Sequence, residues 1–349
     1  MLASFTSTRS LNEATRVSML KLQNQLVTAQ KELATGRLAD VGVTLGGRTS
    51  DTVSLRQQFA RFTTFTETNS IVTTRLNITQ ATLQSFSAAT AKYSSTLIAS
   101  RDTVIGPTVA QGEAKANLIA LMDGLNSTLG GEFLFGGINN AEKPVTNYYD
   151  TPTPANRQAV IDAFTTAFGV PPGDPATANI TPAAMQSFLD GPFGDLFEDP
   201  AWSADWSSAS DRNLQSRISS GEQIETSTNA NELAYRTLAK SYVMLVDLGV
   251  ETLSKETYAG IVDTALTLSG ETIGDLAKVQ ARLGTSAGRV SDANDRMTSQ
   301  QSIMTNEISN LEEVDPIEAA IRVNLLFTQL QAAFALTARV QNLTILNFL

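Results

Sequence analysis

Two stretches far apart in the chain each carry fifteen positions at the alternating three- and four-residue spacing of a helical seam. The first runs from Leu55 to Val104 and the second from Val262 to Leu311, and both are mostly apolar. A sustained 3.5-residue period is typical of a helix that packs against a partner in a left-handed coiled coil. At 1.5 Å per residue, each stretch could span about 75 Å. The pattern therefore predicts a mainly α fold, with two long helices paired as a rod.

Glycines and amides interrupt these seams. Gly274, Gly284 and Gly288 predict a break or bend near the start of the second helix. Amide side chains at seam positions have two interpretations: they fix the register of the pair, or they lie where the bundle opens to solvent. The amides in question are Asn69, Gln280, Asn294 and Gln301.

Composition excludes several classes of function. The chain has 349 residues, 42% of them hydrophobic, which is enough for a real core. Its net charge of −10 argues against nucleic acid as a partner, because phosphate binding needs clustered Lys and Arg. It has no Cys and no His, so it lacks thiol nucleophiles, the commonest general base and the usual zinc ligands. We therefore expect a protein that is not an enzyme and has no cofactor or metal.

Both ends of the chain carry amphipathic helical patterns. Near the amino end, a short seam of Met19, Leu22, Leu26, Ala29 and Leu33 ends at Gly36, a plausible C-cap. Near the carboxyl end, Asp315, Pro316 and Glu318 have the order of an N-cap, a first-turn proline and a capping-box carboxylate. An apolar stripe follows, formed by Val323, Phe327, Leu330, Phe334, Leu336, Val340, Leu343 and Leu346.

The short amino-terminal seam cannot cover the whole carboxyl-terminal stripe. Each large apolar side chain removed from water contributes roughly 1.5 to 3 kcal/mol, so we expect neighbouring copies to cover the rest. The predicted assembly interface consists of Met19, Leu22, Leu26, Leu33, Phe327, Leu330, Phe334, Leu343 and Leu346.

The middle of the chain has a different character. After a turn at Gly106 and Pro107, a helical stripe from Ala114 to Phe133 runs back. Residues 136–228 then hold nine of the eleven prolines and both tryptophans, which predicts an inserted small mixed α/β domain. Within it we expect helices near 156–168 and 181–189 and strands between 214 and 225; a helix over 231–248 rejoins the rod. Its Trp202 and Trp206 are interpreted as filling a small core.

These patterns predict three nested domains. They are a terminal helical assembly domain (1–48 plus 314–349), a helical rod (49–135 plus 229–313) and an inserted outer domain (136–228). Residues 41–50, with three glycines, are expected to form a loop. The acidic residues Glu312, Glu313, Asp315 and Glu318 lack the spacing of a calcium loop and are interpreted as a solvated helix start.

Three short motifs in this nested order resemble those of the flagellin-like polymer subunits. They are Ala34-Thr35-Gly36-Arg37, Gly131-Glu132-Phe133-Leu134-Phe135-Gly136-Gly137 and the carboxyl end Asn347-Phe348-Leu349. The last two look most like the hook-filament junction family, hook-associated protein 3. Filament flagellins typically follow Thr-Gly-x-Arg with an Asn- and Asp-rich run, where this chain has residues 38–48 instead.

The resemblance implies a structural subunit of the bacterial flagellum that joins hook to filament. It further implies secretion by the flagellar type III export apparatus with a dedicated chaperone on the C-terminal helix, and as partners neighbouring copies, the adjacent hook-associated protein and flagellin. The start of the chain has no apolar segment of a cleavable secretory signal. A filament flagellin is the alternative within the same class. A coiled-coil adaptor or tail-anchored membrane protein is the alternative of another class, although six Asn and Gln residues in the last 27 positions argue against a membrane span.

Overall fold

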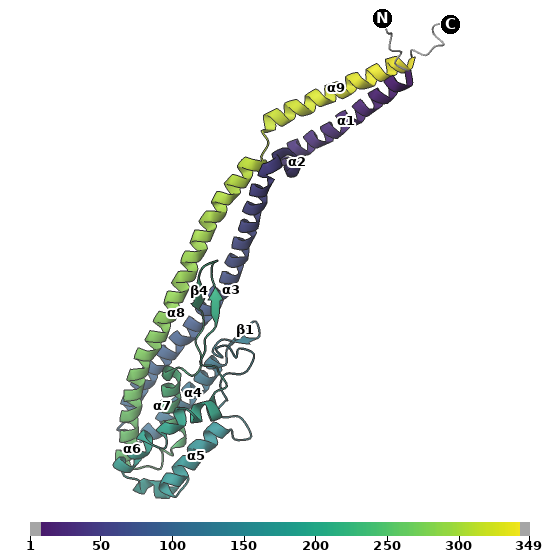
Figure 1. Ribbon diagram of the computed structural model, residues 1–349. Coiled ribbons are helices and arrows are strands. Elements are labelled where there is room, and N and C mark those ends of the chain that lie inside the picture. Colours follow the sequence, from purple (N-terminus) through teal and green to yellow (C-terminus); the bar gives the residue numbers. More distant parts are fainter. Residues whose placement is uncertain (1–7, 343–349) are drawn as a thin grey trace, which may run out of the picture. The chain divides into compact units, whose positions relative to one another are not determined.

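The computed structural model describes residues 8–342, and its contacts divide the chain into two compact units. Unit 1 combines the residues up to Thr63 with those from Met297 onward, and unit 2 is Thr64–Arg296. Most described residues are helical, which confirms the predicted mainly α fold (Figure 1). The two long helices, α3 (Thr49–Ser100) and α8 (Lys255–Glu312), each contribute residues to both units.

Unit 1 is built on a hairpin of α1 (Thr8–Thr35) and α9 (Pro316–Asn342), which lie side by side in Figure 1. The segment predicted as a loop over 41–50 is instead helical. Asp40 caps the short helix α2 (Val41–Leu45) by accepting a hydrogen bond from the Val43 backbone N–H at 3.0 Å. A 3-10 turn, η1 (Gly46–Arg48), then leads into α3. All three glycines, Gly42, Gly46 and Gly47, thus lie in helical elements, because a local side-chain cap supplies the start signal.

Glycine and a cap set the bounds of the hairpin helices. Gly36 ends α1 with φ +67°, a left-handed conformation that side-chain-bearing residues rarely adopt, and its N–H donates to the Glu32 carbonyl at 2.8 Å. Asp315 accepts from the Ile317 N–H at 2.8 Å, and Pro316 is the first residue of α9. The predicted start of the last helix is therefore confirmed.

In unit 2, α3 and α8 run antiparallel and are tied by hydrogen bonds. Asn69 donates to the Asn294 side-chain oxygen at 2.8 Å, and Gln80 donates to the Gln280 carbonyl at 2.8 Å. Every predicted seam position of α3 from Asn69 to Ser100 is buried, ten positions in succession. Val104 is 99% exposed, because α3 ends before it.

The second seam is correct at alternate positions only. Ser269, Leu276, Leu283, Val290 and Met297 are buried as predicted. At the positions between them, the predicted residue is the one that follows the buried residue. For example, Ile273 was predicted to be buried but is 39% exposed, whereas the preceding Thr272 is fully buried. The buried positions in between are Ala265, Thr272, Val279, Ser286 and Ala293, smaller on average than the residues chosen from the sequence. The glycines do not interrupt α8, which is continuous from Lys255 to Glu312.

A third helix, α4 (Gly106–Leu125), packs against α7 (Leu233–Asp247). The predicted stripe to Phe133 overshoots the end of α4, because the chain forms a hairpin there. Strands β1 (Thr128–Leu129) and β2 (Glu132–Phe133) pair antiparallel through Gly130 and Gly131, whose φ angles are +62° and +89°.

The proline-rich segment contains the two expected helices, α5 (Ala155–Phe168) and α6 (Pro182–Asp190), and the expected strands, β3 (Gln215–Arg217) and β4 (Gln223–Glu225), which pair antiparallel. It also contains three turns that the sequence did not predict: the 3-10 turns η2 (Pro175–Asn179) and η3 (Gly194–Phe197) and the single-turn π-helix η4 (Trp202–Trp206).

Trp202 and Trp206 are buried and stacked, with ring centroids 5.3 Å apart and planes 9° apart. Phe197 contacts Trp206, and the aromatic cluster continues through Phe193 to Phe188. The interpretation of the tryptophans as core residues is therefore confirmed.

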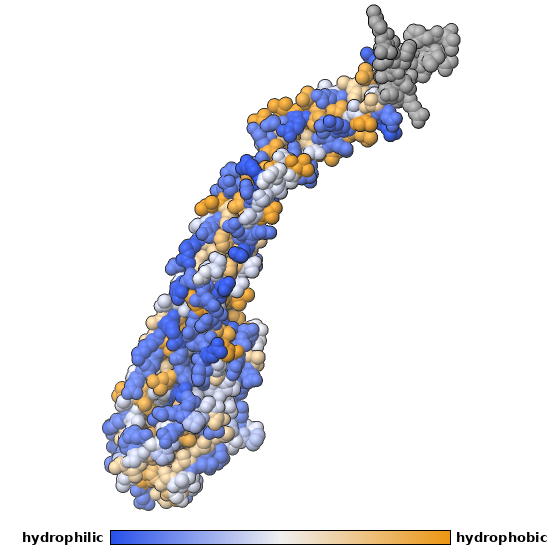
Figure 2. All heavy atoms as spheres, in the orientation of Figure 1, coloured by the Kyte–Doolittle hydropathy of each residue, from blue (hydrophilic) through white to orange (hydrophobic). Residues whose placement is uncertain are grey.

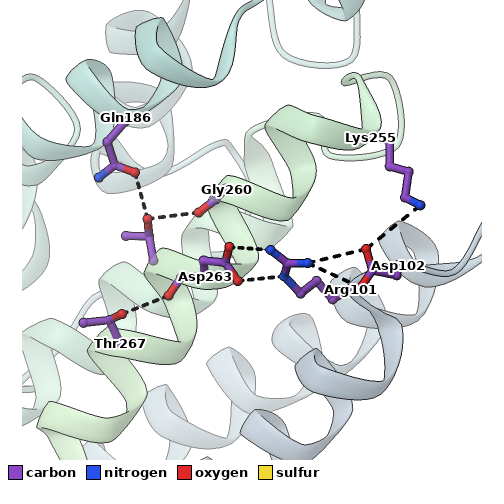
Figure 3. A network of polar contacts seen from close by, with 8 residues as sticks. Arg101, Asp102, Gln186, Lys255, Gly260, Asp263 and Thr267 are labelled. Carbon is purple, nitrogen blue, oxygen red and sulfur yellow. Dashed lines mark hydrogen bonds and ion pairs between the residues drawn. The ribbon is translucent and has the colours of Figure 1, made fainter.

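The end of α3 is clasped to the start of α8 by charged side chains (Figure 3). Arg101 donates twice to the Asp263 carboxylate, both at 2.7 Å, and also contacts Asp102. The Arg101 hydrogen bond holds the pKa of Asp263 below its usual value. Because both side chains are partly solvated, the pair mainly fixes geometry and adds little stability.

Candidate assembly interface

The α1–α9 hairpin of unit 1 brings together the two ends that the sequence predicts as an interface. Two contacts set its antiparallel register. The Thr337 hydroxyl lies 3.6 Å from the Met19 sulfur, and Arg322 donates to the Glu32 carboxylate at 3.2 Å. Between these two contacts α1 advances thirteen residues, from Met19 to Glu32, and α9 advances fifteen, from Arg322 to Thr337. The two lengths are nearly equal, so the helices stay paired from one contact to the other.

The facing side chains form a narrow seam of the 3,4 type. On α1 it comprises Met19, Leu22, Leu26, Ala29 and Glu32; on α9 it comprises Ala319, Val323, Leu326, Leu330, Ala333 and Thr337, and all of these are buried or half-buried. Ala29 is 2% exposed and Ala319 is 1% exposed. Small side chains fill the contact at these positions. The contact is therefore narrow, and the other sides of each helix stay uncovered by its partner.

Buried carboxylates close the base of the hairpin. Glu32 is 5% exposed and accepts hydrogen bonds from Arg322 and from the Ala39 N–H. Glu312, at the end of α8, is 1% exposed and accepts two hydrogen bonds from Arg56. The interpretation of Glu312 as part of a solvated helix start is therefore wrong. The bond to Glu312 raises the pKa of Arg56, which keeps that side chain charged.

Backbone contacts complete this base. The Leu38 N–H donates to the Glu312 carbonyl at 2.8 Å, and the Val314 N–H donates to the Gly36 carbonyl at 3.0 Å. These bonds join the end of α1 to the connection between α8 and α9. The position of the hairpin base is thus determined by polar groups that leave little freedom of register.

The structure divides the predicted interface residues into three groups. Met19, Leu22, Leu26 and Leu330 lie in the intramolecular seam. Leu33, Phe327 and Phe334 are not covered by the residues that the structure describes and are 39%, 51% and 49% exposed. Leu343 and Leu346 lie outside the described residues. The predicted stripe through Phe327 and Phe334 is not the packed one, because the smaller Leu326 and Ala333 occupy the seam instead.

Two opposite sides of the hairpin follow from this seam. One residue along a helix rotates the side chain by about 100°. Phe327 and Phe334 of α9 each come one residue after a seam position. We call these two half-exposed side chains the phenylalanine face.

The other side is hollowed. Lys21, Gln25 and Thr28 each come one residue before a seam position of α1, and Arg322 comes one before Val323 on α9. Together with Val17, Leu20 and Leu326 they line an open groove of about 770 Å³, which we call the groove face. Figure 2 shows apolar side chains, in orange, on the surface of the hairpin.

Sequence reasoning missed several exposed apolar residues of the hairpin. They are Val17, Leu20, Val27, Ile317, Ile321 and Leu325, with exposed fractions from 52% to 73%. The signal was present in the sequence, since these residues recur outside the 3,4 spacing of the seam. A helix with apolar residues on several sides is the pattern of a helix buried from more than one direction.

Other kinds of site find little support in the described part of the chain. Within residues 8–342, no three His, Cys, Asp or Glu side chains are grouped so that they could hold a metal ion. One helix there, over Pro316–Arg339, is long and apolar enough by length and composition to cross a membrane. A single such helix is weak evidence for a membrane span, and its Arg322 forms the ion pair with Glu32 described above.

Comparisons with known proteins agree with this architecture. Residues 6–140 match the family model of the bacterial flagellin N-terminal helical region, and residues 266–349 match that of the bacterial flagellin C-terminal helical region. A solved structure of a protein from Vibrio parahaemolyticus, assigned as a flagellar hook-associated protein, has a similar fold with a TM-score of 0.51 and 8% identity. The match covers 76% of this chain and 97% of that one. No curated protein sequence matches the chain. The two terminal models together span more than half of the sequence, and the chain therefore belongs to the flagellin-like family of structural flagellar subunits.

Proposed function

We propose that this protein is a non-enzymatic structural subunit that forms the junction between hook and filament of the bacterial flagellum. The observation that carries the proposal is the α1–α9 hairpin, which exposes large apolar side chains on two opposite sides. Phe327 and Phe334 are half exposed although each could contribute roughly 1.5 to 3 kcal/mol if buried. Such an exposed apolar surface is typical of a subunit that packs against neighbouring subunits, which cover the apolar side chains.

The choice of junction over filament rests on two further observations. Residues 38–48 depart from the run that follows Thr-Gly-x-Arg in filament flagellins, and 41–48 among them form α2 and η1. The Vibrio parahaemolyticus protein of similar fold is assigned as hook-associated and not as a filament flagellin. The three-domain division of the sequence belongs to the same proposal, with residues 136–228 as the outer domain.

Assembly in this proposal couples folding to association. Isolated helices are marginally stable in water, and α1 and α9 cover each other along a narrow seam only. Contact with neighbouring copies, with the adjacent hook-associated protein and with flagellin would cover the remaining apolar surface. Before assembly, a chaperone bound to α9 would cover the same surface during type III export.

One experiment tests both where the protein lies in the flagellum and whether α9 is needed for its assembly. An epitope tag inserted at Gly221, in the exposed bend between β3 and β4, should be detected by electron microscopy as a single band between hook and filament. A Phe334→Asp variant should fail to enter that band while unit 2 keeps its far-ultraviolet helical signal. Leu233→Asp is the control, because Leu233 is 66% exposed and lies outside the hairpin.

A filament flagellin is the second candidate, favoured by the flagellin terminal models themselves. The tag distinguishes the two, since a filament subunit would be labelled along the whole filament. Normal incorporation of the Phe334→Asp variant would contradict the assignment of α9 to assembly in either case.

A further inference from the structure

The net charge of the protein is concentrated in the segment between β2 and α7. Residues 136–228 hold twelve Asp and Glu against four Lys and Arg, a net charge of −8 out of −10 for the whole chain. From Gln158 to Asp211 the sequence has eight acidic residues and no basic one. Such a field attracts cationic groups at long range, although by itself it defines no binding site.

A small pocket at the start of this segment supplies a site. It lies between the end of α4 and residues 147–150 and has a volume of about 170 Å³. Typical small-molecule sites have volumes of roughly 300 to 1,000 Å³. The pocket therefore has room for one side chain and is too small for most complete ligands. It is lined by Leu118, Ile119, Met122, Asp123, Asn147, Tyr148, Tyr149 and Asp150.

The chain around the pocket is held by side-chain bonds and by packing. Asn126, which follows the last residue of α4, donates to the Val145 carbonyl at 2.9 Å and accepts from the Val145 N–H at 3.0 Å. These two bonds fix the chain just before the pocket residues. Tyr148 stacks on Trp206 with ring centroids 5.4 Å apart. A pocket held in this way needs little reorganisation when a ligand enters it.

The lining combines apolar and anionic groups. Leu118, Ile119 and Met122 of α4 supply apolar surface, and Ile119 is 41% exposed. Asp123 and Asp150 supply two carboxylates, and both residues are exposed. An apolar ligand would cover the first surface but leave the carboxylates beside it without a cation. The ligand that fits the whole lining has an apolar stem and a positively charged end.

Asp123 is the more informative of the two carboxylates. Within the described residues 8–342 it has no hydrogen-bond or ion-pair partner, whereas Asp150 lies 3.7 Å from the Lys143 ammonium. Asp123 also lies in the last turn of α4, where the negative end of the helix dipole disfavours a carboxylate. A cation bound beside Asp123 would offset this repulsion.

We propose that this pocket binds one arginine side chain presented by another protein. The methylene groups of the arginine lie on the apolar residues of α4, and its guanidinium donates to Asp123 and Asp150. Arginine fits better than lysine, because its planar fork of five N–H donors can serve two carboxylates at once. The inference goes beyond the junction assignment, since the pocket belongs to unit 2 and not to the assembly hairpin.

Titration of the full-length protein with Nα-acetylarginine amide tests the proposal. This probe carries the side chain without the backbone charges of a free amino acid, and with about fifteen non-hydrogen atoms it should bind with a dissociation constant of about 1 mM. Carbon-13 labels on the methyl groups of the seven methionines report the binding. The Met122 signal should shift to saturation, whereas Met185 and Met244, which are buried outside the pocket, should not respond.

Two further probes identify the chemistry that the pocket recognises. Nα-acetylcitrulline amide has nearly the same shape as the arginine probe but no charge, so it should bind at least about tenfold more weakly. Free arginine should also bind more weakly than the blocked probe, because Asp123 and Asp150 repel its α-carboxylate.

A pair of variants tests the role of Asp123. Asp123→Asn should raise the dissociation constant of the arginine probe at least about fivefold. The substitution does not endanger folding, because losing a negative charge near the C-terminus favours α4. Asp162→Asn removes an exposed carboxylate of α5 outside the pocket and should change the constant by less than about twofold.

Several outcomes would overturn the proposal. Equal binding of the citrulline probe would make the pocket a site for apolar groups, and tighter binding of free arginine would make it a site for a small amino acid. An unchanged constant in Asp123→Asn, or equal shifts at Met185 and Met244, would also overturn it. So would the absence of any Met122 shift at about 100 mM probe. The tag at Gly221 reports on the junction assignment separately, so the two proposals can fail independently.

Discussion

Arg56 donates two hydrogen bonds to the carboxylate of Glu312, whose side chain is 2% exposed and lies 256 residues away in sequence. Arg56 itself is half exposed, so the pair has one end in solvent and one in the protein. An unpartnered carboxylate at Glu312 would lose its charge-assisted bonds without regaining full hydration.

We therefore expect Arg56→Ala to lower the free energy of unfolding of unit 1 by about 1 to 3 kcal/mol. Hydrogen exchange at the amides of Leu38 and Val314, which donate bonds at the hairpin base, measures the effect locally. Arg61→Ala, an exposed position on the same helix, is the control and should change exchange at these amides by less than twofold. Equal exchange in both variants would show that the pair does not stabilise the base.

Asn69 and Asn294 should fix the register of α3 against α8. Asn69 is fully buried and donates to both the Asn294 side chain and the Ile218 carbonyl. Asn69→Ala should cost about 1 to 3 kcal/mol, because it leaves buried acceptors without a donor. A double-mutant cycle with Asn294→Ala in urea unfolding should give a coupling energy of at least about 0.5 kcal/mol. Additive single mutants would favour the solvent-opening interpretation.

Gly137 occupies a position that other residues cannot take. Its φ is +62°, and a Cβ atom there would lie 2.4 Å from the Ser210 carbonyl oxygen. Gly137→Ala should destabilise unit 2 by more than the 1 to 2 kcal/mol that a left-handed conformation costs roughly by itself. Gly112→Ala, in the interior of α4 with open space around it, should instead stabilise by about 0.5 to 1 kcal/mol. Thermal unfolding of the two variants measures this opposite response, and equal melting temperatures would contradict it.

Alkaline pH should unfold the protein through its tyrosines. Burial raises the pKa of all six, and that of Tyr242 reaches about 12. The folded state favours the neutral phenol, so this stabilisation is complete below the unfolded pKa of about 10 and is lost as pH rises above it.

Ultraviolet absorbance should therefore show little tyrosinate near pH 11 in the folded protein, about one unit above the ordinary pKa, and much more in urea. Ionisation should then appear together with loss of helical circular dichroism. Gradual ionisation at constant helicity would contradict the buried environment of these side chains.

The sequence predicted the helices better than their packed faces. The seam positions from Asn69 to Ser100 were placed correctly because large apolar residues occupy six of the ten. On α8 and α9, the packed positions include Thr272, Ala293 and Ala333, and small residues give a weak signal beside Ile273 or Phe334. Choosing the largest side chain shifted the expected stripe by one residue at those positions.

The residues predicted as one assembly interface have two different roles in the structure. Leu26 and Leu330 pack inside the hairpin, whereas Phe327 and Phe334 remain exposed to a neighbouring molecule. Periodicity cannot distinguish an internal partner from an external one, because both need an apolar stripe. The burial of Glu312 was also beyond a sequence argument, since its partner Arg56 lies on another helix with no local signal.

The pairing of α1 with α9 also dictates when the amino-terminal helix can fold. Glu32 meets Arg322 only after 290 further residues have been made or delivered. In a chain that emerges amino end first, whether from a ribosome or from a pore, α1 therefore has no packing partner until α9 has also emerged. The last helix of the chain provides the surface on which the first one packs.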